Sequence, residues 1–284
     1  CASKTDKKPE ILPASPVFIE STSPPVDASS EKIEVTDIKL PDIKVAAPAF
    51  KPPPPMSPSG SEAPSNPPIS PSEANKNEAH HSEAPNGVTP EVAYRWLKNG
   101  NLRFTKNRLR SDGQSQKDVQ RLAKGQTPHS IVLSCSDSRV PPEILFDQKL
   151  GEIFTVRNAG ETLDSSSIAS IEYALEHLGA KLIVILGHTS CGAVKAAFST
   201  LTGGDAGSPS LNKLVADIHP RLQEFKGHTP SANYLKESWA NAKGIAQDLV
   251  TRSSIVAEKI RNHQAVIQVG LYQIDSGSIE WDNP

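Results

Sequence analysis

The chain has 284 residues, and its 30 lysines and arginines nearly balance its 32 aspartates and glutamates. This balance excludes the strongly basic surface that nucleic-acid binding needs, and no apolar run reaches the roughly 18 residues of a membrane-spanning helix. The length allows one large domain or two small ones.

Residues 1–87 differ in composition from the rest of the chain. They hold 17 of the 25 prolines and contain neither tryptophan nor tyrosine. Their long tracts of serine, alanine, glutamate and lysine cannot bury enough apolar surface to offset the entropy of an ordered chain. The sequence therefore predicts a disordered Pro/Ser-rich tether over residues 1–87 and one globular domain over residues 88–284.

The chain starts with Cys1, which the small residues Ala2 and Ser3 follow. This start resembles a bacterial lipoprotein after removal of its signal peptide, in which the first cysteine carries a lipid. The resemblance implies lipidation of Cys1 and a periplasm-facing membrane anchor in the bacterial cell envelope. The residues after the cysteine favour the outer membrane over the inner one. The alternative is that residue 1 is an arbitrary starting point.

The first helix of the domain is expected over residues 90–104. Thr89 can cap its N-terminus, and Pro90 suits the first helical position. Gly100 is expected to weaken the end of this helix. The residues expected to face inward are Val92, Trp96 and Leu97.

Strand and helix patterns then alternate along the chain. Residues 129–135 and 152–158 are short apolar runs on both faces, which is typical of parallel strands covered by helices. The pattern predicts a helix over 165–179, with Asp164 as its N-cap and Gly179 as its stop. Further expected elements are a buried strand over 180–188, a helix over 192–201, one long or two consecutive helices over 231–263, and two strands within 265–281. The alternation predicts an α/β fold with a mainly parallel sheet flanked by helices.

Two of the expected strands end in metal-binding side chains. Cys135 ends one strand, His188 ends another, and Cys191 follows three residues later. In open α/β sheets, ligands gather beyond the carboxyl ends of the strands. Two cysteines and one histidine suit zinc, and three protein ligands leave the fourth position open, as in catalytic sites. The alternative is a disulfide between Cys135 and Cys191.

Asp137 and Arg139 follow Cys135 at intervals of two residues. The guanidinium of Arg139 can hold the Asp137 carboxylate in a two-pronged pair and keep it off the metal. We therefore expect two states, one with water on the zinc and a closed one with Asp137 as the fourth ligand. The alternative is an ion pair with a purely structural role.

The segments "CSDSRVPPEILFDQ" and "GHTSCGAVKAA" resemble a β-class carbonic anhydrase of the plant-like branch, and the likeness extends to "GNLRF", "AKGQTP", "VRNAG", "ASIEYALEHLG" and "GLYQIDSGSIEW". It implies zinc on Cys135, His188 and Cys191, and a catalytic dyad of Asp137 and Arg139. The implied reaction is the reversible hydration of carbon dioxide to bicarbonate and a proton, by attack of zinc-bound hydroxide. It also implies a homodimer or a dimer of dimers, in which the neighbouring subunit walls each active site. The implied substrate contacts are Gln126, Phe154, Ala159, Tyr173 and Gly192.

Two positions depart from the pattern of this family. Ala159 is smaller than the usual valine, and Glu161 stands where relatives usually carry asparagine. Two other functions stay open. Relatives on the same scaffold hydrolyse carbonyl sulfide or carbon disulfide with the same ligands. A non-catalytic, zinc-stabilised adaptor of the cell envelope is the other possibility, and a broken dyad would mark it.

Overall fold

The computed structural model describes residues 87–282. The expected tether and the expected lipid site at Cys1 lie outside these residues and stay predictions. Within the described part of the chain, no helix is both long and apolar enough to cross a membrane.

The domain is built on one sheet of five strands in the order β2-β1-β3-β4-β5. The strands are β1 (Ser130–Cys135), β2 (Ile153–Asn158), β3 (Leu182–His188), β4 (Val266–Tyr272) and β5 (Ile279–Trp281). The first four run parallel, and β5 pairs antiparallel with β4. The predicted α/β fold with a mainly parallel sheet is therefore confirmed. Every residue of β1 and of β3 is buried, because helices cover both faces at the centre of the sheet.

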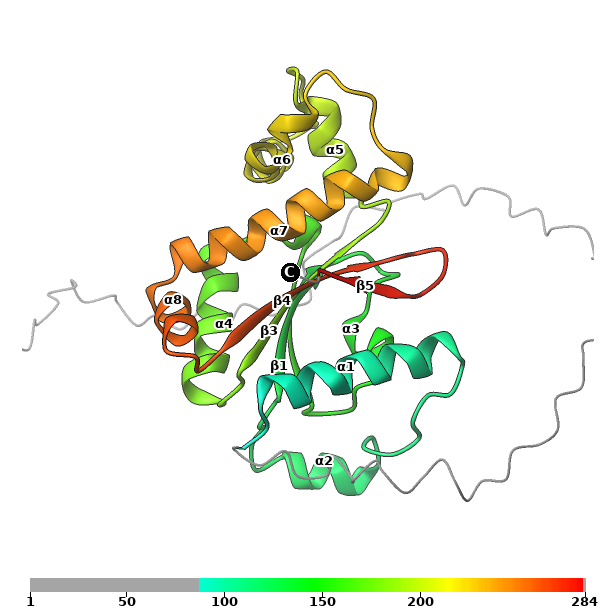
Figure 1. The fold of residues 1–284 in the computed structure, drawn as a ribbon, viewed down its shortest axis with the longest axis vertical. Coiled ribbons are helices and arrows are strands. Elements are labelled where there is room, and N and C mark those ends of the chain that lie inside the picture. Colours follow the sequence, from blue (N-terminus) through cyan, green and yellow to red (C-terminus); the bar gives the residue numbers. More distant parts are fainter. Residues whose placement is uncertain (1–86, 283–284) are drawn as a thin grey trace, which may run out of the picture. The chain divides into compact units, whose positions relative to one another are not determined.

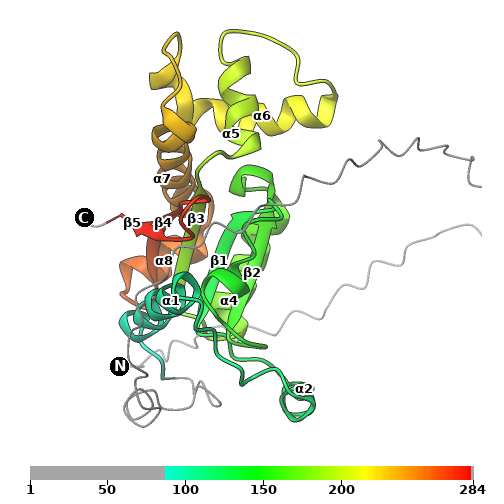
Figure 2. The same cartoon turned by 90° about the vertical axis from the view of Figure 1, so that its right-hand side faces the viewer.

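Eight α-helices surround the sheet in the described range. They are α1 (Pro90–Thr105), α2 (Gln116–Leu122), α3 (Pro142–Leu145), α4 (Ser165–His177), α5 (Gly192–Thr200), α6 (Pro209–Leu222), α7 (Leu235–Arg252) and α8 (Ser254–Arg261), with short 3-10 turns at η2 (Ala159–Glu161), η3 (Gln223–Phe225) and η4 (Ala232–Tyr234). Helices α4, α7 and α8 pack on one face, and α1 and α3 pack on the other (Figure 1). Figure 2 shows α5 and α6 beyond one end of the strands and α2 beyond the opposite end.

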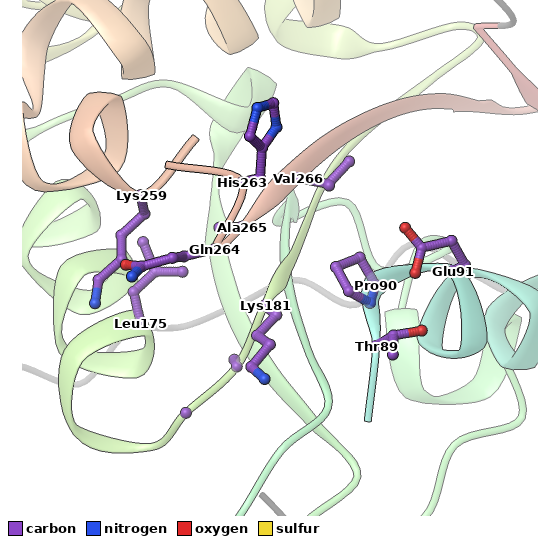
Figure 3. Close-up of a pocket in the computed structure, with 12 residues that line it drawn as sticks. Thr89, Pro90, Glu91, Leu175, Lys181, Lys259, His263, Gln264, Ala265 and Val266 are labelled. Carbon is purple, nitrogen blue, oxygen red and sulfur yellow. The ribbon is translucent and has the colours of Figure 1, made fainter. Parts of the chain in front are cut away.

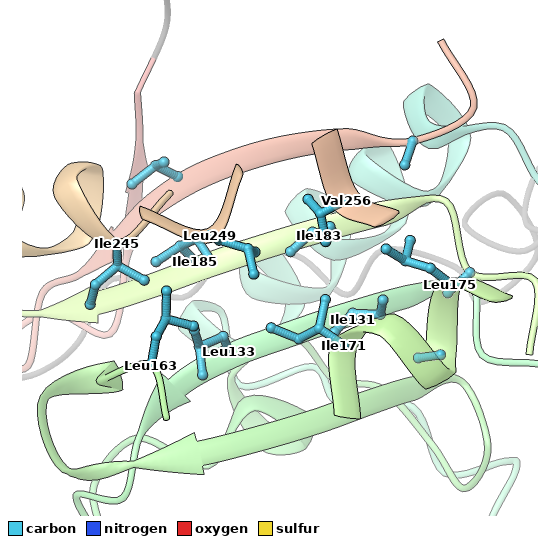
Figure 4. Close-up of a cluster of buried hydrophobic side chains, with 14 of the residues drawn as sticks. Ile131, Leu133, Leu163, Ile171, Leu175, Ile183, Ile185, Ile245, Leu249 and Val256 are labelled. Carbon is cyan, nitrogen blue, oxygen red and sulfur yellow. The ribbon is translucent and has the colours of Figure 1, made fainter. Parts of the chain in front are cut away.

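The strand alternation divides the core into two layers. Ile131 and Leu133 of β1 face α4, α7 and α8, whereas Val132 between them faces α1. Figure 4 shows the first layer, where β1 and β3 side chains meet Ile171 of α4 and Leu249 of α7. Each fully buried aliphatic side chain stabilises the fold by about 1.5–3 kcal/mol relative to an exposed one. The residues at the ends of the central strands are therefore attached to the most buried part of the fold.

Helix α1 begins where the sequence predicts, because the Thr89 hydroxyl accepts a hydrogen bond from the Val92 amide at 3.4 Å. One detail of the prediction is wrong. The stripe that faces inward runs through Ala93, Leu97, Gly100 and Asn101, while Val92 and Trp96 are only partly buried. The helix continues past Gly100 to Thr105, and Gly100 permits close packing, since a Cβ there would lie 1.7 Å from the Phe146 carbonyl oxygen.

The expected helical region 231–263 contains two helices. Ser253 adopts an extended conformation after α7, and its hydroxyl accepts a hydrogen bond from the Val256 amide and so caps α8. The predictions did not include α2 and α6. Helix α6 begins with Ser208 as N-cap and Pro209 at its first position, which is the same signal as Thr89 and Pro90.

Candidate metal centre

The two central strands carry Cys135 and His188 to the same edge of the sheet. Ser134 pairs with Leu186, so β1 and β3 end side by side. Cys191 returns to this point as the N-cap of α5, after a turn in which Ser190 has a positive φ of 56° and its amide donates to the Asn233 carbonyl. The ligating atoms of the three residues all lie within 4.8 Å of one another, and all three side chains are buried. The spacing suits tetrahedral zinc, whose bonds to sulfur and nitrogen are about 2.0–2.3 Å long.

One ring nitrogen of His188 faces this centre and has no hydrogen-bond partner among the described residues. Its Nδ1 lies 2.9 Å from the Thr189 carbonyl oxygen, which accepts a hydrogen bond in the tautomer that carries hydrogen on Nδ1. Nε2 then has a free lone pair, and it is buried with no hydrogen-bond partner in the described part of the chain. An unpartnered buried nitrogen is costly, and coordination to a metal would satisfy it.

The two cysteines are free thiols rather than a disulfide. The pKa of Cys135 is lowered, chiefly because the Cys191 thiol donates a hydrogen bond to it; burial opposes this shift. The Gly160 amide also donates to the Cys135 sulfur, at 3.4 Å. Because Cys191 holds the shared proton and is buried, its own pKa is raised. A divalent cation would replace this proton and allow both sulfurs to carry charge, so the donor set fits zinc.

Asp137 is held beside the three ligands by Arg139. Its Oδ1 accepts from the Arg139 backbone amide and from Nε, both at 2.9 Å, and its Oδ2 accepts from Nη2 at 2.7 Å. These bonds are the main reason why the pKa of Asp137 is lowered to about 2. Oδ2 lies 4.0 Å from His188 Nε2. Asp137 is therefore an ionised acceptor that faces the metal centre while Arg139 holds it.

A second arginine fixes the turn that contains Cys135 and Asp137. Arg157 of β2 donates from Nε to the Cys135 carbonyl at 3.0 Å and from Nη2 to the Asp137 carbonyl at 2.7 Å. The sequence predictions gave Arg157 no role. It belongs to the "VRNAG" segment, but only the pairing of β2 with β1 brings its guanidinium over the end of β1.

Comparisons with known proteins bear on this site. Residues 130–279 match the family model for carbonic anhydrase. The chain is 37% identical to carbonic anhydrase 2 of Mycobacterium tuberculosis over 191 residues, which are 67% of this chain and 91% of that enzyme. The chain belongs to the β-class carbonic anhydrases. A carbonic anhydrase of Helicobacter pylori is 30% identical over 170 residues, 54% of this chain and 76% of its own.

Solved structures agree with this membership. A tetrameric β-carbonic anhydrase from Sordaria macrospora superposes with a TM-score of 0.53 at 25% identity, over 58% of this chain and 86% of its own. The Coccomyxa β-carbonic anhydrase, solved in complex with acetazolamide, gives a TM-score of 0.52 at 25% identity, over 57% and 75% of the two chains. As a β-carbonic anhydrase, this protein is an enzyme that hydrates carbon dioxide.

Two of the five expected substrate contacts lie at the metal centre of this carbonic anhydrase. Gly192 follows Cys191 directly and begins α5, so its backbone N–H has no partner within the helix. Ala159 begins η2 and is exposed, next to the Gly160 amide that contacts the Cys135 sulfur.

The other three expected contacts do not reach the metal centre of their own chain. Phe154 pairs with Ile131, four residues before Cys135, which is roughly 13 Å away along the strand. Gln126 lies before the start of β1, at the opposite end of the sheet. Tyr173 is on α4, half exposed, with its ring 5.1 Å from that of His177.

Glu161 lies immediately behind the centre, in a fully buried position with a positive φ of 45°. The Asn241 amide donates to Glu161 Oε1 at 3.3 Å, and Oε2 has no partner among the described residues. Burial, and then the negative charge of Cys135, raise the pKa of Glu161 to about 8. The sequence marked Glu161 as a departure from the family pattern, but it gave no sign that Asn241, 80 residues later, is the partner.

A hollow of about 730 Å³ lies away from the metal centre. That hollow lies at the amino ends of β3 and β4 and is lined by residues that include Lys181, Lys259 and Leu175 (Figure 3). Lys259 is already paired with Glu176 at 2.9 Å. None of the metal-centre residues lines this hollow.

Proposed function

We propose that this β-carbonic anhydrase hydrates carbon dioxide reversibly with a zinc ion held by Cys135, His188 and Cys191. The observation that carries the proposal is the convergence of two buried thiols on a buried imidazole nitrogen that has no hydrogen-bond partner among residues 87–282. A zinc ion in this position would lower the pKa of a bound water from 15.7 toward about 7 and so supply a nucleophile at neutral pH.

Asp137 orients the attacking oxygen in this proposal. With a pKa of about 2, the carboxyl group is ionised at neutral pH and can only accept hydrogen bonds. A carboxylate oxygen can accept two bonds, so Oδ2 can keep the bond from Arg139 and take one from the attacking water. Such positioning aims the oxygen lone pair at the substrate carbon. Arg139 also keeps Asp137 from closing the site as a fourth ligand.

We further propose that the functional unit is a homodimer or a dimer of dimers. A second copy would then supply Gln126, Phe154 and Tyr173, which are remote from their own metal centre. Two features support this. The outer edge of β2 has no paired strand among residues 87–282. A hollow of about 710 Å³ beside the start of β2 is lined by Leu109, Ile144 and Leu150, and these apolar side chains are about half exposed.

The hydration activity is tested by stopped-flow measurement on the zinc-loaded full chain between about pH 6.5 and 9. Fast turnover that rises with one ionisation supports the proposal. Absence of turnover with one zinc per chain refutes it, and turnover of carbonyl sulfide alone would favour the hydrolase alternative.

The role of Asp137 is tested with Asp137→Asn. This variant should keep its zinc and lose turnover by about 10²–10⁴-fold, the usual contribution of a positioned proton-accepting group. Asp112→Asn is a matched control, because Asp112 accepts two bonds from the Arg110 guanidinium two residues away, at 2.9 and 3.0 Å. Parent-like activity in Asp137→Asn would remove the dyad from the mechanism.

The shared site is tested by mixing two inactive variants. Cys191→Ser lacks a zinc ligand, and Gln126→Ala lacks a substrate contact. In a hybrid dimer, the intact Gln126 of one copy faces the intact zinc site of the other. Refolding the two variants together should restore about a quarter of the parent sites, as two-fold symmetry requires. No gain on mixing would refute a site shared between copies.

A further inference from the structure

A chain of buried hydrogen bonds leads from the Cys135 sulfur into helix α7. The Gly160 amide donates to Cys135 Sγ at 3.4 Å. The side-chain amide of Asn241 donates to the Gly160 carbonyl at 3.0 Å and to Glu161 Oε1 at 3.3 Å. Gly160 is buried, and Glu161 and Asn241 are fully buried. Water therefore cannot replace these bonds, and each is stronger than it would be at the surface.

The turn that carries the Gly160 amide has an unfavourable backbone. Gly160 has φ and ψ of 64° and 29°, and the non-glycine Glu161 follows with a φ of 45°. A left-handed conformation costs of order 1–3 kcal/mol for a residue such as Glu161, so the surrounding structure must hold it. A side chain at Gly160 is excluded, since its Cβ would lie 2.9 Å from both Ala193 Cβ and Ile218 Cδ1.

Asn241 is suited to hold this turn because its own side chain is fixed. Its Oδ1 accepts from Arg221 Nη1 at 3.4 Å, and Arg221 in turn donates from Nε to Asp248 Oδ2 at 2.9 Å. One end of the Asn241 amide is therefore fixed from α6, and the other end contacts both residues of the turn. Among the side chains of residues 87–282, Asn241 is the one that donates a hydrogen bond to the Gly160 carbonyl.

We propose that Asn241 is a positioning residue of the metal centre, which holds the Gly160–Glu161 turn so that the Gly160 amide stays on the Cys135 sulfur. An N–H bond to a thiolate withdraws charge from the sulfur, so the sulfur donates less to a bound cation, and the cation polarises its open position more strongly. This matters in a site with two thiolates, which neutralise much of the metal's charge. The inference rests on the proposed zinc ligands.

The test uses Co²⁺ in place of zinc in the full chain, because a cobalt–thiolate bond gives a charge-transfer absorption band that reports the electron density of the sulfur. In Asn241→Leu, which removes both donors at similar volume, the band should move to longer wavelength. The matched control is Asn101→Leu. Asn101 is also buried and donates to two carbonyls, those of Leu145 and Gly277, but it has no link to the cysteines. The control should lose stability, because two buried hydrogen bonds are removed, but its band should stay where the parent has it.

The outcomes separate this inference from the proposed function. No charge-transfer band in the parent would refute the zinc ligands, and the inference would fall with them. A parent band that does not move in Asn241→Leu, or that moves equally in Asn101→Leu, would overturn the inference alone. Asn241→Ala replaces Asn241→Leu if the leucine variant does not fold.

A second measurement needs no variant. In the parent loaded with NMR-active cadmium, the Gly160 amide proton should show scalar coupling to the metal through the sulfur. Absence of this coupling, while the cysteines are bound to cadmium, would also overturn the inference.

Discussion

Glu161→Gln should remove a pH-dependent loss of stability from the metal-free protein. Burial raises the pKa of Glu161 to about 8, from an ordinary value of 4.5. Between these values the unfolded chain releases the proton and the folded chain keeps it, so the free energy of unfolding falls as the pH rises. The shift of about 3.5 pKa units corresponds to an upper bound of about 4–5 kcal/mol. The loss begins above about pH 4.5 and is complete above about pH 8.

Urea unfolding in the presence of a chelator measures this effect, at one protein concentration and at about pH 5, 7 and 9. Glutamine keeps an oxygen that can accept the Asn241 bond but does not titrate. The parent and Glu161→Gln should be close in stability at the lowest pH, and the variant should be the more stable by several kcal/mol at the highest. All other residues are the same in both proteins, so the difference between the two curves reports the effect of the Glu161 carboxyl group, including its interaction with the charge on Cys135. The exposed Glu224→Gln controls for loss of a charge. Parallel curves for the parent and Glu161→Gln would refute the argument.

Three further outcomes are expected. Because the pKa of Asp137 is about 2, the hydration rate should show no inflection from this group between about pH 4 and 9. An inflection that is present in the parent and absent in Asp137→Asn would contradict the pairing of Asp137 with Arg139. Cys191→Ser should lose zinc on dialysis, measured by elemental analysis; full occupancy would exclude Cys191 as a ligand. Gly100→Ala should lower the free energy of unfolding, measured with urea, by about 1–3 kcal/mol or more, since its Cβ would lie 1.7 Å from the Phe146 carbonyl oxygen. Gly87→Ala is the control and should leave this free energy unchanged, because the space around Gly87 is open.

The sequence by itself determined the parallel strands, where they end, and most of the helices, although it missed α2 and α6. Runs of apolar residues and capping residues act over a few positions, so Thr89, Asp164 and the four parallel strands could be identified without tertiary information. Cys135 and His188 end adjacent parallel strands, and such ends meet at one edge of a sheet. The convergence of Cys135, His188 and Cys191 was therefore predictable from local patterns alone.

Only the tertiary structure decided which polar groups support that centre and which expected residues reach it. Arg157 contacts the Cys135–Asp137 turn across the β1–β2 pairing, and Asn241 contacts Gly160 from a helix 81 residues later. A hydrogen-bond partner is chosen by the packing of whole elements, and no local periodicity encodes it. The same reason separates Gly192, which lies at the site, from Gln126 at the far end of the sheet. Local sequence patterns placed the three side chains that could hold a metal, and long-range packing placed the polar groups around them.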